Sequence, residues 1–224
     1  MLIYVTIVVL CTWQVRKDIQ SDIVKLLLEN NLNVVLCDND GCSPLLMASQ
    51  NGHTDIVKLL LERNPNNDLC CNNGLSSLYM ASLEGHTDIV KFLSERNPNV
   101  DLCDKDGCSA LYYASDQGHT DMVKLLLERN PNNDLCCNNG LSSLYMASLE
   151  GHTDIVKFLS ERNPNVDLCD KDGCSALYYA SDQGHTDMVK LLLERNPNND
   201  LCCNKGLSFL YMASLEGHTD IVKI

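Results

Sequence analysis

The sequence has 224 residues, with 30 acidic and 17 basic side chains and a formal net charge of −13 at pH 7. Because nucleic-acid phosphates and anionic membrane surfaces would repel such a chain, neither is predicted as a partner. The 13 cysteines follow the spacing of an internal repeat and form no spacing code of their own. We therefore expect reduced thiols in a cytoplasmic protein.

The chain begins with an apolar segment, residues 1–21. Its apolar run from Met1 to Val15 is shorter than the roughly 20 residues of a membrane-spanning helix, and the absence of a basic start disfavours a signal peptide. Two interpretations stay open: a degenerate first helix that covers the end of the fold, or sequence left by an incorrect start site. Residues 22–40 are predicted to form a partial repeat, because 22–29 carry the pattern of a repeat's second helix.

A period of 33 residues organises the rest of the chain. It defines five complete repeats in residues 41–205 and a truncated sixth in residues 206–224. Residues 74–139 recur at 140–205 with Asn139 replaced by Lys205 as the one difference. Since repeat arrays need end repeats with a polar outer face, the truncated repeat suggests a piece of a longer array or an incomplete gene product. The period is kept by Gly41, Gly74, Gly107, Gly140, Gly173 and Gly206 and by His53, His86, His119, His152, His185 and His218.

Each repeat is predicted to contain two helices joined by a tight turn. In the repeat that begins at Gly107, Ser109 is placed to cap the first helix and Thr120 to cap the second. The second helix is leucine-rich on more than one side, so neighbouring repeats must cover it. Asn130 and Pro131 are predicted to end it, because proline cannot continue a helix and disfavours helical geometry in the residue before it. The segment that follows is typical of a turn or short hairpin.

The sequence from Gly52 to Leu61, Gly-His-Thr-Asp-Ile-Val-Lys-Leu-Leu-Leu, recurs in phase with this helix, turn, helix and hairpin pattern. In this it resembles the ankyrin repeat family over residues 22–224. The resemblance implies an all-α solenoid of stacked helix-turn-helix repeats with short hairpins along one edge. The family's Thr-Pro-Leu-His is replaced by Ser-Pro-Leu-Leu from Ser43 and by Ser-Ser-Leu-Tyr from Ser76, where the tyrosine hydroxyl could stand in for the imidazole in bonding between repeats.

No constellation of catalytic or metal-binding residues is apparent, so no enzyme, cofactor or metal is predicted. The histidines of successive repeats lie about 10 Å apart if one repeat is as thick as two packed layers, too far to share one ion, and each is expected to order the turn between helices. Cys103 with Cys108 and Cys169 with Cys174 bracket hairpin turns and are predicted to face each other within bridging reach. We expect most thiols to be unreactive, with a redox-sensitive pair as the next interpretation and a metal site as the last.

The resemblance implies a protein-protein interaction module or scaffold that binds a protein partner on the concave face of the solenoid. The alternative is a structural or spring-like tether in a longer array, favoured by the near-identity of the duplicated units. By the resemblance, the partner contacts the hairpin tips Asn72, Asn73, Lys105, Asp106, Asn138, Asn139, Lys171 and Asp172. It also contacts the first-helix ends Gln50, Asn51, Leu83, Glu84, Asp116, Gln117, Leu149, Glu150, Asp182 and Gln183. Leu83 and Leu149 are predicted to face solvent as apolar anchors among carboxylates, which suits a partner with basic and hydrophobic residues.

Overall fold

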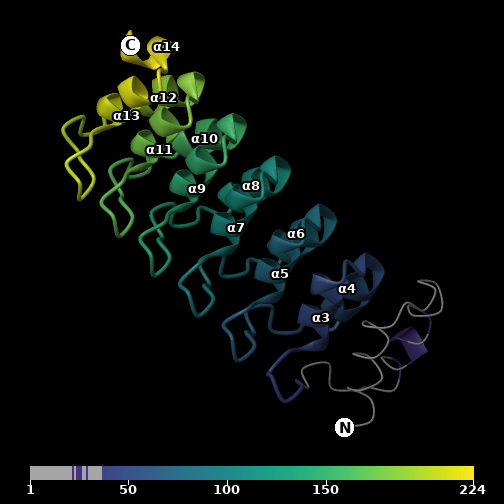
Figure 1. The fold of residues 1–224 in the computed structure, drawn as a ribbon. Coiled ribbons are helices and arrows are strands. Elements are labelled where there is room, and N and C mark those ends of the chain that lie inside the picture. The colour runs from purple at the N-terminus through teal and green to yellow at the C-terminus, as the bar shows by residue number, and fades with distance from the viewer. Residues whose placement is uncertain (1–21, 23, 27–28, 30–36) are drawn as a thin grey trace. The chain divides into compact units, whose positions relative to one another are not determined.

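The computed structural model describes residues 22, 24–26, 29 and 37–224. The predicted apolar segment, residues 1–21, lies outside the described residues. In the predicted partial repeat, the described residues among 22–29 are helical, as expected. The chain divides into two compact units, residues 1–105 and 106–224. In each of them pairs of short helices follow one another, with a looped hairpin between pairs (Figure 1), so the predicted all-α repeat solenoid is confirmed.

The unit formed by residues 1–105, the N-terminal unit, contains two of these helix pairs in its described part. The first helices of the two pairs pack against each other, and so do the second helices. A short tight turn joins the helices of each pair, which makes them antiparallel neighbours. The four helices are α3 (Pro44–Gln50), α4 (Thr54–Leu61), α5 (Ser77–Leu83) and α6 (Thr87–Ser94).

The unit formed by residues 106–224, the C-terminal unit, contains four helix pairs. Here α7 packs against α9, α9 against α11 and α11 against α13, so that the first helices form one layer. The second helices form the other layer, in which α10 packs against both α8 and α12. The first helices are α7 (Ala110–Asp116), α9 (Ser143–Leu149), α11 (Ala176–Asp182) and α13 (Phe209–Leu215); the second helices are α8 (Thr120–Leu127), α10 (Thr153–Ser160), α12 (Thr186–Leu193) and α14 (Thr219–Val222).

Serine hydroxyls start the first helices, as predicted. The Oγ atom of Ser109 accepts a hydrogen bond of 3.2 Å from the backbone N–H of Tyr112, which satisfies one of the amides that the first turn leaves without a helical partner. The predicted threonine cap of the second helix is wrong. Thr120 is the first residue of α8, and the residue before it, His119, makes no capping bond with its side chain. The turn is closed by the backbone instead, because the N–H of His119 donates to the carbonyl oxygen of Ala114 at 2.9 Å.

The core lies between the two layers of helices. Ile155, Val156 and Leu159 of α10 are at most 1% exposed, as the leucine-rich pattern predicted. Each such side chain contributes about 1.5–3 kcal/mol of hydrophobic stabilisation when fully buried. The second helices end as predicted: α8 stops at Leu127, and Asn130 adopts a left-handed conformation with φ of 51°. Asparagine tolerates that conformation better than most residues.

Candidate partner-binding surface

The predicted hairpin tips carry exposed side chains on a backbone that the neighbouring repeat holds in place. In the N-terminal unit the N–H of Asn72 donates to the carbonyl oxygen of Asp40 at 2.8 Å, and in the C-terminal unit the N–H of Asn138 donates to that of Asp106 at 2.7 Å. Because these bonds fix the backbone, little further order is needed for the tips to bind a partner. The exposed tip residues are Asn72, Asn73, Lys105, Asp106, Asn138, Asn139, Lys171 and Asp172.

The predicted residues at the ends of the first helices fall into two classes of exposure. At each of the five predicted positions the last residue of the helix is half-buried, whereas the residue after it caps the helix and is exposed. At α9, for example, the N–H of Glu150 donates back to the carbonyl oxygen of Met146 at 2.9 Å. The half-buried residues are Gln50, Leu83, Asp116, Leu149 and Asp182. The exposed ones are Asn51, Glu84, Gln117, Glu150 and Gln183.

Leu83 and Leu149 are not the solvent-facing anchors that the sequence suggested, because both are half-buried. Leu149 packs against a buried cluster of thiols and aromatic rings within the C-terminal unit. The prediction compared these leucines with the polar residues at equivalent positions and could not include the packing against α7, which carries Tyr112 and lies beside α9. The cluster consists of Cys108, Tyr112, Cys137, Tyr145 and Met146.

Tyrosine hydroxyls bond to aspartates of the hairpins beside their helices, and the bond from Tyr179 to Asp170 crosses from one repeat to the one before it, as the sequence suggested. Tyr79 donates to Oδ2 of Asp104 at 2.7 Å, and Tyr145 donates to Oδ2 of Asp170 at 2.8 Å. Burial, together with the bonds to Tyr179 and Asp170, raises the pKa of the Tyr145 hydroxyl well above its ordinary range. Asp170 also accepts from the hydroxyl of Tyr179 at 3.3 Å, so this carboxylate fixes the base of its hairpin against two helices.

The histidines also bond between repeats and hold the predicted surface directly. In the C-terminal unit, Nε2 of His152 lies 3.0 Å from the carbonyl oxygen of Asp116, and Nε2 of His218 lies 2.9 Å from that of Asp182. Each imidazole must carry its proton on Nε2 to make this bond, because a carbonyl only accepts. The histidines therefore do more than order their own turn: they fix the end of the preceding first helix.

The predicted thiol pairs across the hairpins are wrong. Cys169 lies opposite Ser175 in the hairpin ladder, so the neighbouring Cys174 points to the other face. Cys174 instead lies beside Cys203 of the next hairpin. Among the described residues, no three or more His, Cys, Asp or Glu side chains come together in a way that could hold a metal ion.

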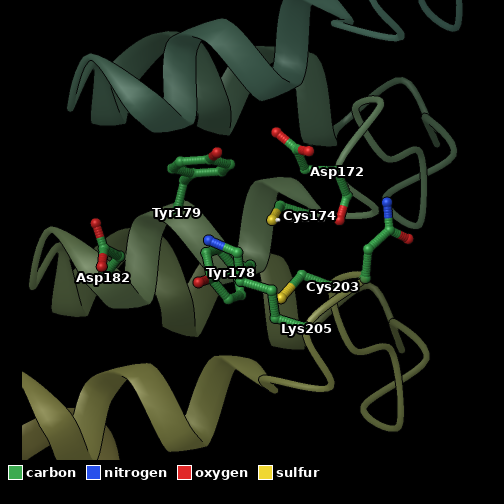
Figure 2. A pocket seen from close by; sticks show the side chains of 8 residues that line it. Asp172, Cys174, Tyr178, Tyr179, Asp182, Cys203 and Lys205 are labelled. Atoms are coloured by element: carbon green, nitrogen blue, oxygen red, sulfur yellow. Dashed lines mark hydrogen bonds between the residues drawn. The ribbon is translucent and has the colours of Figure 1, made fainter.

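Two predicted surface residues meet at a pocket of about 230 Å³ in the C-terminal unit. Figure 2 shows Asp172 from the hairpin tip and Asp182 from the end of α11 at opposite sides of this pocket. Two aromatic rings, Tyr178 and Tyr179, lie between them. The pocket thus combines two carboxylates and two aromatic rings, groups that attract cations, with the ammonium group of Lys205. Its other lining residues are Cys174, Cys203, Asn204 and Lys205.

A family model described as ankyrin repeats matches the chain three times, over residues 13–104, 96–168 and 144–224. These matches span most of the sequence, and the chain belongs to the ankyrin repeat family. No curated protein matches the sequence closely enough to suggest an individual relative. In the part of the chain that the structure describes, every helix is too short or too polar to cross a membrane.

Proposed function

We propose that this chain is a non-enzymatic scaffold that binds a partner protein through the hairpin tips and first-helix ends of its repeats. The observation that carries this proposal is the construction of the tips. Their side chains are exposed, and their backbone is fixed by hydrogen bonds to the next repeat, as between Asn138 and Asp106. Ankyrin repeats generally serve as protein-protein interaction modules, and a rigid row of exposed side chains suits that role.

The charge of the surface favours a partner with basic residues. In the C-terminal unit Glu150 and Asp172 are exposed, and the chain as a whole has a net charge of −13. The pocket between Asp172 and Asp182 adds the rings of Tyr178 and Tyr179. A lysine or arginine side chain suits such a site, because its apolar stem can lie on the rings while its charged end meets a carboxylate.

The test reverses charge on the proposed surface and, as a control, elsewhere on the same unit. The surface variant combines Glu150→Lys with Asp172→Lys. The control combines Glu161→Lys with Glu194→Lys, which change the net charge equally at exposed residues after the second helices α10 and α12. Each variant is immobilised and exposed to a cell lysate at low and at moderate salt. The proteins that it captures are identified by mass spectrometry.

We expect the surface variant to lose the partners that the control keeps, and the bound partners to be released as salt rises. Equal loss from both variants would show that only net charge matters, and retention by both would overturn the proposal. Replacing Leu149 by alanine is a poor test, because this side chain packs against the buried cluster and its loss would also weaken the fold.

The tether remains the second candidate, favoured by the near-identity of residues 74–139 and 140–205. A surface tuned to one partner would be expected to differ between copies. For a tether, single-molecule extension should show repeats that unfold and refold reversibly under force, while the surface variant behaves as the unmodified chain does in every binding assay.

A further inference from the structure

Among the described residues, cysteines of consecutive hairpins lie beside each other at three places. Each pair consists of two cysteines. The first directly follows the glycine of one hairpin, and the second directly precedes the tip of the next hairpin. In all three, a Cβ atom added to that glycine would lie 3.4–3.5 Å from Cα of the second cysteine, so the two backbones adjoin. The pairs are Cys42 with Cys71, Cys108 with Cys137, and Cys174 with Cys203.

A backbone hydrogen bond holds the hairpins of Cys174 and Cys203 together. The N–H of Asn204 donates to the carbonyl oxygen of Asp172 at 2.7 Å, which fixes the chain next to each of the two cysteines. Figure 2 shows the sulfur atoms of Cys174 and Cys203 on neighbouring hairpins, both within the group that lines the pocket. Two thiols on adjoining backbones with facing side chains meet the first requirement for a disulfide.

The cysteines of this pair are as buried as those of its equivalent, since Cys108 and Cys174 are both 5% exposed and Cys137 and Cys203 both 7%, but the rings beside them differ. Cys108 and Cys137 belong to the buried cluster, where Tyr112 is 9% exposed and Tyr145 is 3% exposed. At the last pair, the corresponding Tyr178 is half-buried and Tyr211 is 52% exposed. Cys174 and Cys203 line a cavity of about 230 Å³, large enough to admit a small molecule.

We propose that Cys174 and Cys203 form a peroxide-sensitive dithiol, in which Cys203 reacts first with hydrogen peroxide and Cys174 then closes a disulfide between consecutive hairpins. The assignment of roles follows from the surroundings of the two sulfurs. It does not depend on the identity of any protein partner.

Cys203 has the environment of the attacking thiol. Burial alone would raise the pKa of Cys203, but hydrogen bonds from the backbone of Leu207 and Lys205, and from the side chains of Cys174 and Tyr178, outweigh it and lower the pKa. Burial and the charge of Asp170 raise the pKa of Cys174 to about 12. The thiolate, which is the nucleophilic form, therefore forms more readily on Cys203 than on Cys174.

In the first step the Cys203 thiolate attacks one oxygen of hydrogen peroxide. The O–O bond breaks, a sulfenic acid forms on Cys203, and the other oxygen leaves as hydroxide, which takes a proton to become water. In the second step the sulfur of Cys174 attacks the sulfenic sulfur, the S–O bond breaks, and the released hydroxide takes the proton of the Cys174 thiol. Both thiols are oxidised, one peroxide is reduced, and two waters are formed.

The disulfide would join the hairpin that precedes α11 to the hairpin that precedes α13. Because the link restricts the unfolded chain, it should slow the opening of the last repeat. It would also fix the positions of Asp172 and Lys205 on either side of the pocket. Peroxide would thereby change a part of the surface that we propose for partner binding.

The experiment treats the fully reduced chain with a small excess of hydrogen peroxide, alkylates the remaining thiols in acid, and maps the peptides by mass spectrometry. We expect the bridged Cys174–Cys203 peptide, lighter by two hydrogen atoms, to appear before any bridge between Cys108 and Cys137. Earlier oxidation of the exposed Cys202, or a first bridge at another pair, would overturn the proposal.

Variants separate the two roles. Cys203→Ser should abolish the bridge, whereas Cys202→Ser, which changes the adjacent exposed thiol, should leave it. Cys174→Ser should leave a sulfenic acid on Cys203 that dimedone labels. A failure of dimedone to label Cys203 in this variant would refute the order of reaction, and circular dichroism of each reduced variant verifies that it is folded.

Discussion

Alanine at two hairpin glycines of the C-terminal unit should measure how tightly consecutive hairpins fit together. Gly140 and Gly107 have nearly the same backbone, with φ of 82° and 77°. Their surroundings differ. A Cβ atom at Gly140 would lie 2.6 Å from the carbonyl oxygen of Cys169, which is backbone. At Gly107 the nearest atom would be Oδ1 of Asn138 at 3.2 Å, at the end of a side chain that can move.

Both substitutions share the cost of a left-handed alanine, about 1–2 kcal/mol, offset by about 0.4–1 kcal/mol from the stiffer unfolded chain. Gly140→Ala must also push apart two hairpins, since 2.6 Å is shorter than Cβ atoms tolerate. Overpacking of this kind costs about 1–3 kcal/mol. We therefore expect Gly140→Ala to lower the free energy of unfolding by about 1–3 kcal/mol more than Gly107→Ala does.

Urea unfolding followed by circular dichroism measures this difference, and amide hydrogen exchange in α9 and α11 locates it. The shared backbone cost cancels between the two variants, so the difference reports the contact between hairpins. If the two variants unfolded at the same urea concentration and exchanged alike, the close approach of the Gly140 and Cys169 hairpins would be refuted.

Further predictions concern bonds between and within repeats. Tyr145→Phe removes the hydrogen bond to Asp170 and should lower the free energy of unfolding by about 1–2 kcal/mol in a urea titration, whereas Tyr211→Phe at an exposed ring should change it by less than about 0.5 kcal/mol. Ser142→Ala removes the cap of α9 and should cost about 1 kcal/mol, which Ser142→Thr should largely avoid. The near-identical 66-residue units can pair out of register, so dimers should increase with protein concentration after refolding and be visible by light scattering.

The period of 33 residues was enough to predict the helix pairs, the serine caps and the buried second helices. Each of these depends on residues close together in the sequence. Ser109 caps its helix by accepting from the amide of Tyr112, three residues later. Asn130 and Pro131 end the helix that directly precedes them. Local signals of this kind repeat in every unit and reinforce each other.

Contacts between residues far apart in the sequence could not be predicted in the same way. Tyr145 and Asp170 are 25 residues apart, and only the stacking of hairpins on helices brings them together. Leu149 was misjudged for the same reason. The thiol pairs across the hairpin failed through register: the ladder places Cys169 opposite Ser175, and a shift of one residue moves a side chain to the other face.

The paired thiols should also set the alkaline limit of stability. Burial is the main cause that raises the pKa of both Cys42 and Cys174 from about 9 to about 12. Between those values the unfolded chain loses these protons while the folded chain retains them, so the folded state binds more protons and the free energy of unfolding falls as pH rises. The contribution is fully present below pH 9 and is lost towards pH 12.

Under reducing conditions, Cys42→Ser with Cys174→Ser should therefore make the decline in urea stability above pH 9 shallower, because serine does not titrate there. The control variant Cys202→Ser, at an exposed thiol, should leave the decline nearly unchanged. An equally steep decline in the first variant would show that other groups govern alkaline unfolding.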